Sequence, residues 1–381
     1  MKEHQTLAPE TRKFRLGIFG GDLTQPISMM RILGPFSAMM KEDERLEIVL
    51  PSAVNGHYEL GWSWLCRCDA IFYSHPTTDV DLGVIALAHH MGVKVWIEYV
   101  DDIFSVLPTN PAYQNVKNRR AIREAVTQAI ALADFTSSVS QLCAAAYPFS
   151  DRIGVIPEAC LWPAKQLPRR KAISWRGLDS HDGDTDGIID AVCRVAKEFP
   201  DWEWVLMGKP SEDLVERLTF AAGKDADGES MVKVAPFFAT PWHAIHAWSY
   251  RAPYLHIAPL ADNEFNRAKS HLAWLEASAV GAAVIAPDYL PEWQQPGVIP
   301  YSGGVVSFNG KQDFEATLRR EMKTYDIAPG TLHLNVLEAR QAIYPQRTEP
   351  YINQLRWQVL RKLAASAAPE TKSTAVEPAA V

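Results

Sequence analysis

Short hydrophobic runs alternate with longer amphipathic segments along most of the chain. In the first half, runs rich in β-branched and aromatic residues predict strands at Phe14–Phe19, Leu46–Leu50, Ala70–Tyr73, Val93–Tyr99, Phe135–Val139 and Ile153–Ile156. Two of the segments between them, Gln25–Met40 and Val116–Leu132, have the apolar period of a helix. Strands that alternate with helices indicate a parallel sheet, because parallel neighbours need a long crossover connection.

The alternation stops once and then restarts. The segment Pro157–Lys171 contains three prolines and a cluster of basic residues, and it has no helical period. After it we expect strands at Ala172–Trp175, Trp204–Met207, Val232–Ala235, Tyr254–Ala258, Ala283–Ala286 and Val305–Phe308. Helices are expected at Asp186–Phe199, Ser211–Ala222, Thr240–Tyr250, Arg267–Val280 and Gln312–Tyr325. The sequence therefore predicts two α/β units at 12–164 and 171–345, a helix at 346–363 that crosses back to the first, and a disordered tail at 364–381.

Composition narrows the class of protein. The 381 residues are 47% hydrophobic and carry a formal net charge of −7, which excludes a chain disordered throughout and argues against a dedicated nucleic-acid binder. An enzyme that acts on DNA is not excluded. No apolar stretch reaches the roughly 18 residues of a membrane span, and the first residues lack the apolar core of a secretory signal. The five cysteines are scattered without zinc-site spacing, so we expect a cytoplasmic protein with reduced thiols.

Polar and glycine residues follow several predicted strands. In open parallel sheets the functional loops lie at the carboxyl ends of the strands. Gly20 and Gly21 follow the first strand, where they let the backbone approach a ligand, although the run lacks the dinucleotide fingerprint. Asp101 and Asp102 follow another strand; they could bind Mg²⁺, take a proton from a hydroxyl, or only cap the loop. His181 and the aspartates after it could likewise form a metal site or a helix-capping loop.

The segment Pro259–Asp288 reads as strand end, polar loop, helix, glycine stop and strand. Lys269 and Glu276 are seven residues apart, so on one helix they share a face at a separation of about 10.5 Å. Lys269 and Ser270 are expected in the first turn, where free N–H groups favour an anion. A phosphate at the helix start and a ribose hydroxyl on Glu276 would explain both side chains. The alternative is that both are solvated surface charges.

This stretch resembles the donor-binding segment of GT-B-fold glycosyltransferases of the retaining, glycogen-synthase-like families. The residues that carry the resemblance are Glu264, Phe265, Asn266, Lys269, Ser270, Glu276 and the run ASAVGAAVIAP at 277–287. Asn266 replaces the family's glycine, and F-N-x-x-K-S is similar to a variant in bacteriophage-encoded glycosyltransferases. The resemblance implies an α/β fold of two facing Rossmann-like domains with parallel sheets. It also implies an acceptor-side first domain and a nucleotide-sugar-binding second domain. The donor expected first is a UDP-sugar.

The resemblance also implies roles for single residues. Arg176 would bind the donor diphosphate together with Lys269, with a strand-end surface charge as the alternative; Gly208 would let the nucleotide approach, and His75 would lie near the acceptor. The catalytic candidates are His75, Asp101, Asp102, Arg176 and Lys269. The donor-binding candidates are Gly20, Gly21, Gly177, Gly208, Phe237, Glu264, Phe265, Asn266, Ser270 and Glu276. No resident metal is required, and Mg²⁺ is an option at the paired aspartates.

Three functions remain open at the level of the sequence. The first is a retaining transferase whose acceptor is a glycan, a lipid-linked sugar or a modified DNA base, placed in the host cytoplasm if the protein is phage-encoded. The second is a sugar-nucleotide epimerase, which can have the same two-domain architecture. The third is a catalytically degenerate binding protein. The oligomeric state is also open.

Overall fold

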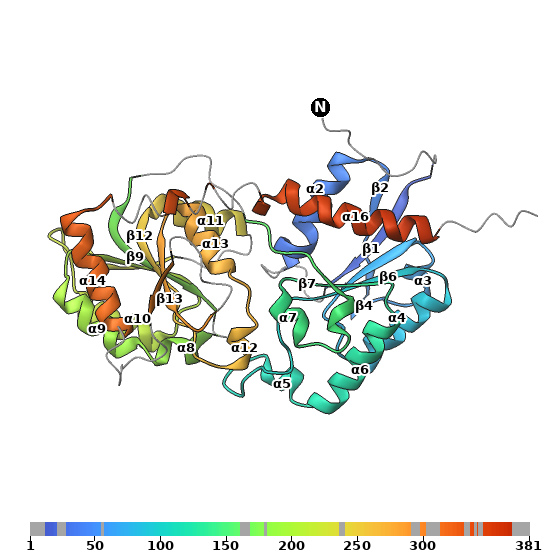
Figure 1. Cartoon of the computed structure of the whole chain (residues 1–381), viewed down its shortest axis with the longest axis horizontal. Helices are drawn as coiled ribbons and strands as arrows, with labels where there is room; N and C mark the ends of the chain where they lie inside the picture. Colours follow the sequence, from blue (N-terminus) through green and yellow to red (C-terminus); the bar gives the residue numbers. More distant parts are fainter. Residues whose placement is uncertain are drawn as a thin grey trace, which may run out of the picture.

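Two α/β units, each built on a six-stranded parallel sheet, make up the protein (Figure 1). The computed structural model describes residues 12–20, 28–54, 57–160, 168–178, 181–235, 241–290, 298–301, 313–330, 336–338, 341 and 346–367. This confirms the predicted fold class of two Rossmann-like units with parallel sheets. Within the described residues, no helix is both long enough and apolar enough to cross a lipid bilayer.

The sheet of the N-terminal unit has the strand order β2-β1-β5-β6-β7-β8. Its strands are the six that the sequence predicts: β1 Phe14–Phe19, β2 Leu46–Val49, β5 Ala70–Ser74, β6 Lys94–Tyr99, β7 Phe135–Ser138 and β8 Ile153–Val155. A small antiparallel pair, β3 Ala53–Val54 and β4 His57–Tyr58, lies outside this sheet. The helical elements are η1 Met29–Leu33, α2 Gly34–Glu42, α3 Trp62–Leu65, α4 Asp79–His90, α5 Tyr113–Val116, α6 Arg119–Leu132, α7 Gln141–Ala145 and η2 Ser150–Arg152.

The sheet of the C-terminal unit has the order β11-β10-β9-β12-β13-β14. Its strands are β9 Arg170–Gly177, β10 Glu203–Gly208, β11 Val232–Ala235, β12 Pro253–Ile257, β13 Ala283–Pro287 and β14 Val298–Tyr301. The helices are α8 Asp182–Asp186, α9 Ile189–Glu198, α10 Glu212–Ala222, α11 Pro241–Arg251, α12 Glu264–Arg267, α13 Leu272–Val280 and α14 Phe314–Ile327. The strand predicted at Val305–Phe308 lies outside the described residues, and the sixth strand of this sheet is instead Val298–Tyr301, parallel to β13.

The last helix, α16 Glu349–Ala367, lies beside α2 on the N-terminal unit (Figure 1). Ile352 and Leu360 join the apolar core around Phe36, and the indole of Trp357 donates a hydrogen bond of 3.1 Å to Glu42. The prediction that disorder begins at Ala364 is wrong, because the helix continues to Ala367 with its apolar side packed on this core. Residues 368–381 of the predicted tail lie outside the described residues.

Burial on both faces explains why these strands were recognisable. All residues of β12 and β13 are buried, as expected for central strands covered by helices on either side. Helix starts have their own signals, since the side chains of Thr78, Ser140, Ser211 and Asp313 each accept a hydrogen bond from an N–H three residues further on. The sheets and helices together bring the carboxyl ends of the strands of both units to face one cavity.

Candidate active site between the two units

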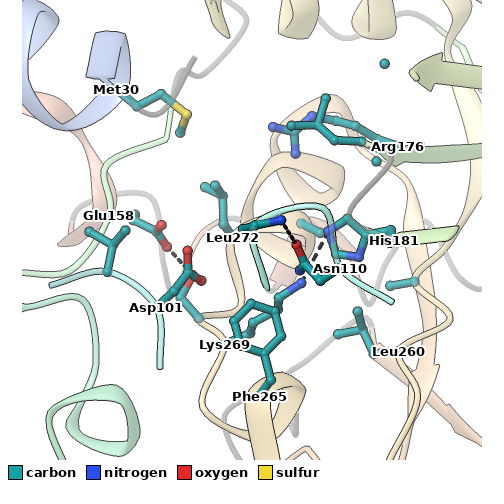
Figure 2. Close-up of a pocket in the computed structure, with 18 of the residues that line it drawn as sticks. Met30, Asp101, Asn110, Glu158, Arg176, His181, Leu260, Phe265, Lys269 and Leu272 are labelled. Atoms are coloured by element: carbon teal, nitrogen blue, oxygen red, sulfur yellow. Dashed lines mark hydrogen bonds between the residues drawn. The ribbon is translucent and has the colours of Figure 1, made fainter. Parts of the chain in front are cut away.

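A cavity of about 560 Å³ lies between the two units. It opens where β5, β6, β9, β10 and β12 end, and residues of both units line it (Figure 2). Its volume falls in the range of small-molecule sites, about 300–1,000 Å³. Of the residues predicted from the sequence, those that line it are His75, Asp101, Arg176, Gly177, Gly208, Phe265, Lys269 and Ser270.

Other predicted residues lie elsewhere. Gly20, Asp102, Glu264, Asn266 and Glu276 do not line the cavity. Glu264 is exposed and accepts a hydrogen bond of 3.3 Å from Ser105 of the N-terminal unit, so it joins the two units beside the site. Gly21 and Phe237 lie outside the described residues.

Arg176 and Glu276 form an ion pair at the edge of the cavity. Arg176, near the end of β9, keeps a quarter of its side chain exposed, whereas Glu276 in α13 is buried. Burial raises the pKa of Glu276 to about 7, against the opposing effect of Arg176. Glu276 is therefore not the solvated surface charge of the alternative reading. A carboxyl held in this way behind a partly exposed guanidinium can accept hydrogen bonds from a ligand bound to that guanidinium.

The predicted helix Arg267–Val280 is wrong in its first part, because two helices with a bend between them occupy this stretch. α12 ends at Arg267 and α13 begins at Leu272, so Lys269 and Ser270 lie in the connection and not in a first helical turn. The bend is held by distant partners: the Ser270 hydroxyl donates to the Glu158 carboxylate, and the side-chain amide of Asn266 donates to Asp184 at 2.7 Å. Lys269 and Glu276 consequently do not share one helix face.

Lys269 nevertheless points into the cavity beside His181 (Figure 2). Its Nζ lies 3.3 Å from Nε2 of His181, and Nδ1 of that ring lies 2.9 Å from Oδ2 of Asp184. Burial lowers the pKa of Lys269, while the carboxylates of Asp101 and Asp184 oppose this effect. With Arg176 it places two cationic side chains of the C-terminal unit on one cavity. Such a pair suits a ligand with two adjacent negative groups.

His75 is held on both ring nitrogens. Nε2 accepts a hydrogen bond of 3.1 Å from the N–H of Val100, and Nδ1 lies 2.9 Å from the hydroxyl of Ser74. The residue has a positive φ of 53°, and burial lowers the pKa of its ring. Because Nε2 accepts from a backbone N–H, the neutral ring carries its proton on Nδ1. This geometry favours a role in positioning the loop of Val100 and Asp101 over a role as a free base.

The paired aspartates have different environments. Asp101 lines the cavity, and its backbone carbonyl accepts a hydrogen bond from Tyr147. Asp102 is buried and accepts a hydrogen bond of 3.0 Å from the N–H of Phe104, as a loop-capping residue does. Among the described residues, no group of three or more His, Cys, Asp or Glu side chains is placed to hold a metal ion.

Glu158 is a cavity residue that the sequence interpretation missed. It lies just after β8, faces the site with Asp101, and is buried (Figure 2). Burial raises the pKa of its carboxyl, although the charge of Arg31 and the Ser270 hydrogen bond oppose this. Its position after a strand was the available signal, but it lay within the proline-rich linker. Asp184, one of the aspartates after His181 that the sequence offered as a metal site or helix-capping loop, instead contacts Lys269 through His181.

Close packing explains why glycine stands at three positions near the site. Gly208 has φ = +94°, and a Cβ there would collide with the carbonyl oxygen of Gly177 on the neighbouring strand. A Cβ at Gly177 would meet the ring of Trp175, and one at Gly20 would meet Ile32. Close packing of β9 and β10 thus accounts for Gly208 without a ligand, and it also leaves bare backbone on the cavity wall.

Solved structures resemble most of the chain. Sucrose-phosphate synthase from Thermosynechococcus elongatus matches with a TM-score of 0.58 at 14% identity, covering 93% of this chain and 100% of that chain. The UDP-GlcNAc 2-epimerase from Neisseria meningitidis, solved with UDP-GlcNAc, matches with a TM-score of 0.51 at 10% identity over 91% of this chain and 99% of that one. A pneumococcal O-GlcNAc transferase, solved with UDP and GlcNAc, has a TM-score of 0.51 at 14% identity; the match covers 77% of this chain and 57% of the transferase.

These similarities show the fold. No protein-family model matches the sequence, and no curated protein matches it. The chain has the GT-B fold, with its cavity at the facing carboxyl ends of the two sheets.

Proposed function

We propose that the protein is a glycosyltransferase that moves a sugar from a nucleotide-sugar donor to an acceptor. The preferred donor would be a UDP-sugar. The observation that carries the proposal is the pair Arg176 and Lys269 on the C-terminal wall of the cavity, with the buried Glu276 behind Arg176. In this arrangement the two cations bind the donor diphosphate and stabilise the charge that develops as it leaves. Glu276 accepts hydrogen bonds from the ribose.

The N-terminal wall would receive the acceptor. Asp101 and Glu158 face the cavity there, and His75 holds the loop that carries Asp101. The resemblance to retaining families supports attack from the face that the diphosphate leaves, with a departing phosphate oxygen taking the acceptor proton. The acceptor would be a glycan or a modified DNA base; the phage-like F-N-x-x-K-S segment supports the base, which would have to be flipped out or single-stranded.

Epimerisation of a nucleotide sugar is the second candidate. The observation in its favour is the presence of two carboxyl groups, Asp101 and Glu158, on the wall that faces the cations. Because burial raises the pKa of Glu158, this carboxyl holds its proton to a higher pH than usual, which suits proton transfer to and from a sugar ring. Conversion of a UDP-sugar to a stereoisomer without any acceptor would establish this function instead.

A thermal-shift screen tests the donor site. UDP-, GDP-, ADP- and CMP-sugars are added to the wild type, to Lys269→Ala and Glu276→Ala, and to the exposed controls Lys41→Ala and Glu216→Ala. At 100 times its dissociation constant, a donor stabilises the fold by about 2.7 kcal/mol. We expect one donor class to stabilise the wild type and both controls but not the two site variants.

Equal stabilisation of all five proteins would contradict this donor site, and no stabilisation by any nucleotide sugar would leave a degenerate binding protein as the better reading. Mass spectrometry of glycans and DNA incubated with the enzyme and the selected donor then identifies the acceptor by its gain of one sugar.

A further inference from the structure

A buried histidine of the C-terminal unit lines the cavity beside Arg176. His256 lies in β12, pairs in register with Ser174 of β9, and is 1% exposed. Since side chains alternate along a strand, Ser174, Arg176 and His256 lie on the same face of the sheet. Their neighbours in this layer include the apolar Met207 of β10 and Ala258 just beyond β12. Polar side chains therefore interrupt an apolar layer at the cavity wall.

The hydrogen bonds of Ser174 fix the tautomer of the ring. Its hydroxyl oxygen lies 3.2 Å from the carbonyl oxygen of Leu255, 3.0 Å from Nε1 of Trp248 and 3.1 Å from Nδ1 of His256. A carbonyl can only accept a hydrogen bond, and an indole N–H can only donate one. All three contacts are hydrogen bonds at once when the hydroxyl donates to Leu255 and accepts from Trp248 and from a protonated Nδ1. Nε2 then carries no proton, and it is the nitrogen that remains for a ligand.

The surroundings of the ring favour its neutral form. The partner of Nδ1 is a hydroxyl, and the cation of Arg176 lies nearby. Burial, together with the charge of Arg176, lowers the pKa of His256 to about 3. A neutral ring with an unprotonated Nε2 can accept a hydrogen bond from a hydroxyl group. It offers nothing to a phosphate oxygen, which is itself an acceptor.

We propose that His256 is a specificity-determining residue that accepts a hydrogen bond from a ribose hydroxyl of the nucleotide whose phosphate binds Arg176. The nucleotide as ligand rests on the proposed function. Two acceptors flank Arg176, the carboxylate of Glu276 and the ring of His256, and a ribose offers two adjacent hydroxyls near a phosphate. The transferred sugar has to reach the wall of Asp101 and Glu158, so the nucleoside is the part left for the interior of the C-terminal unit. The site should therefore prefer ribonucleotides to deoxyribonucleotides.

Calorimetry with UDP, 2′-deoxy-UDP and 3′-deoxy-UDP tests this assignment. We expect the wild type to bind each deoxynucleotide about tenfold more weakly than UDP, because each leaves a buried acceptor unpaired. In His256→Phe, which keeps a ring but no acceptor, the preference for one of the two hydroxyls should fall below about twofold while the other is kept. The exposed control His90→Phe should match the wild type. Equal preferences in the wild type and His256→Phe would overturn the proposal, whereas no binding of UDP would contradict the proposed function as well.

A second measurement starts from the ligand-free protein, so it separates this proposal from the proposed function. Long-range proton–nitrogen correlation NMR of isotope-labelled histidine reports which ring nitrogen carries the proton, and His256 is assigned by its absence from the spectrum of His256→Gln. We expect a protonated Nδ1 and an unprotonated Nε2, and a shift of the Nε2 signal when UDP is added. A protonated Nε2 in the ligand-free protein would overturn the proposal even if UDP binds.

Discussion

Replacing the buried Glu276 by Gln should stabilise the fold at alkaline pH while damaging the site. Glu276 is buried in α13, and its ion-pair partner Arg176 remains partly exposed. Burial raises the pKa of the carboxyl from its ordinary value of 4.5 to about 7. A group whose pKa is higher in the folded state favours folding while it is protonated. For Glu276 this contribution is lost as the pH rises from the ordinary pKa of 4.5 to the folded-state pKa of about 7.

The size of the effect follows from the difference between these two pKa values. Each tenfold change in proton activity is worth about 1.4 kcal/mol for one proton, so ionisation of Glu276 above pH 7 costs the folded state about 3 kcal/mol relative to the protonated form. Glutamine has nearly the same shape without the charge. Glu276→Gln should therefore raise the free energy of unfolding by about 3 kcal/mol at pH 8 and by less than about 1 kcal/mol at pH 5.

Urea unfolding followed by tryptophan fluorescence at both pH values measures the difference. Glu216→Gln, an exposed change on α10, is the matched control and should alter stability at neither pH. A Glu276→Gln protein no more stable than the wild type at pH 8 would refute the reasoning. So would a gain of equal size at pH 5, because a packing effect does not depend on proton activity.

Two further predictions concern the backbone and the buried charges. Gly208→Ala should lower the free energy of unfolding by about 2 kcal/mol more than Gly228→Ala, because both glycines have positive φ but only the first would place a Cβ against backbone; urea unfolding of the two variants decides this. Glu98→Gln should lower the free energy of unfolding by about 3 kcal/mol or more, because it leaves the buried Arg31 without its carboxylate partner. Glu124→Gln, which removes a charge from an exposed pair, should leave the urea midpoint unchanged.

The architecture could be predicted because it depends on local signals. Central strands such as β12 and β13 are apolar runs of strand length bounded by turn residues, and the break near residue 165 separates two sets of them. The main error in the described C-terminal unit was the helix assumed at Arg267–Val280. Its bend depends on hydrogen bonds from Asn266 and Ser270 to partners 82 and 112 residues away, which no local period reveals.

The site was predictable to the extent that its residues follow strands. Arg176 and Asp101 stand at or just beyond strand ends, and both line the cavity. Glu158 was missed, and Asp184 was expected only as part of a metal site or helix-capping loop, because the importance of both comes from what they contact across the fold. Asp102 was predicted as a catalytic residue because it follows a strand, but it does not line the cavity. Its neighbour Asp101 faces the cavity, whereas the carboxylate of Asp102 caps the loop.

The cations of the cavity both have internal carboxylate partners in the empty protein. Arg176 pairs directly with Glu276, and Lys269 reaches Asp184 through His181. The buried charge is thus nearly balanced before any ligand enters, which limits the cost of holding cations at a low-dielectric interface. Under the proposed function, a diphosphate would have to compete with these carboxylates, and part of its binding energy would be used to displace them. That competition would lower the affinity for a bare diphosphate relative to a nucleotide whose ribose hydroxyls bind Glu276 in exchange.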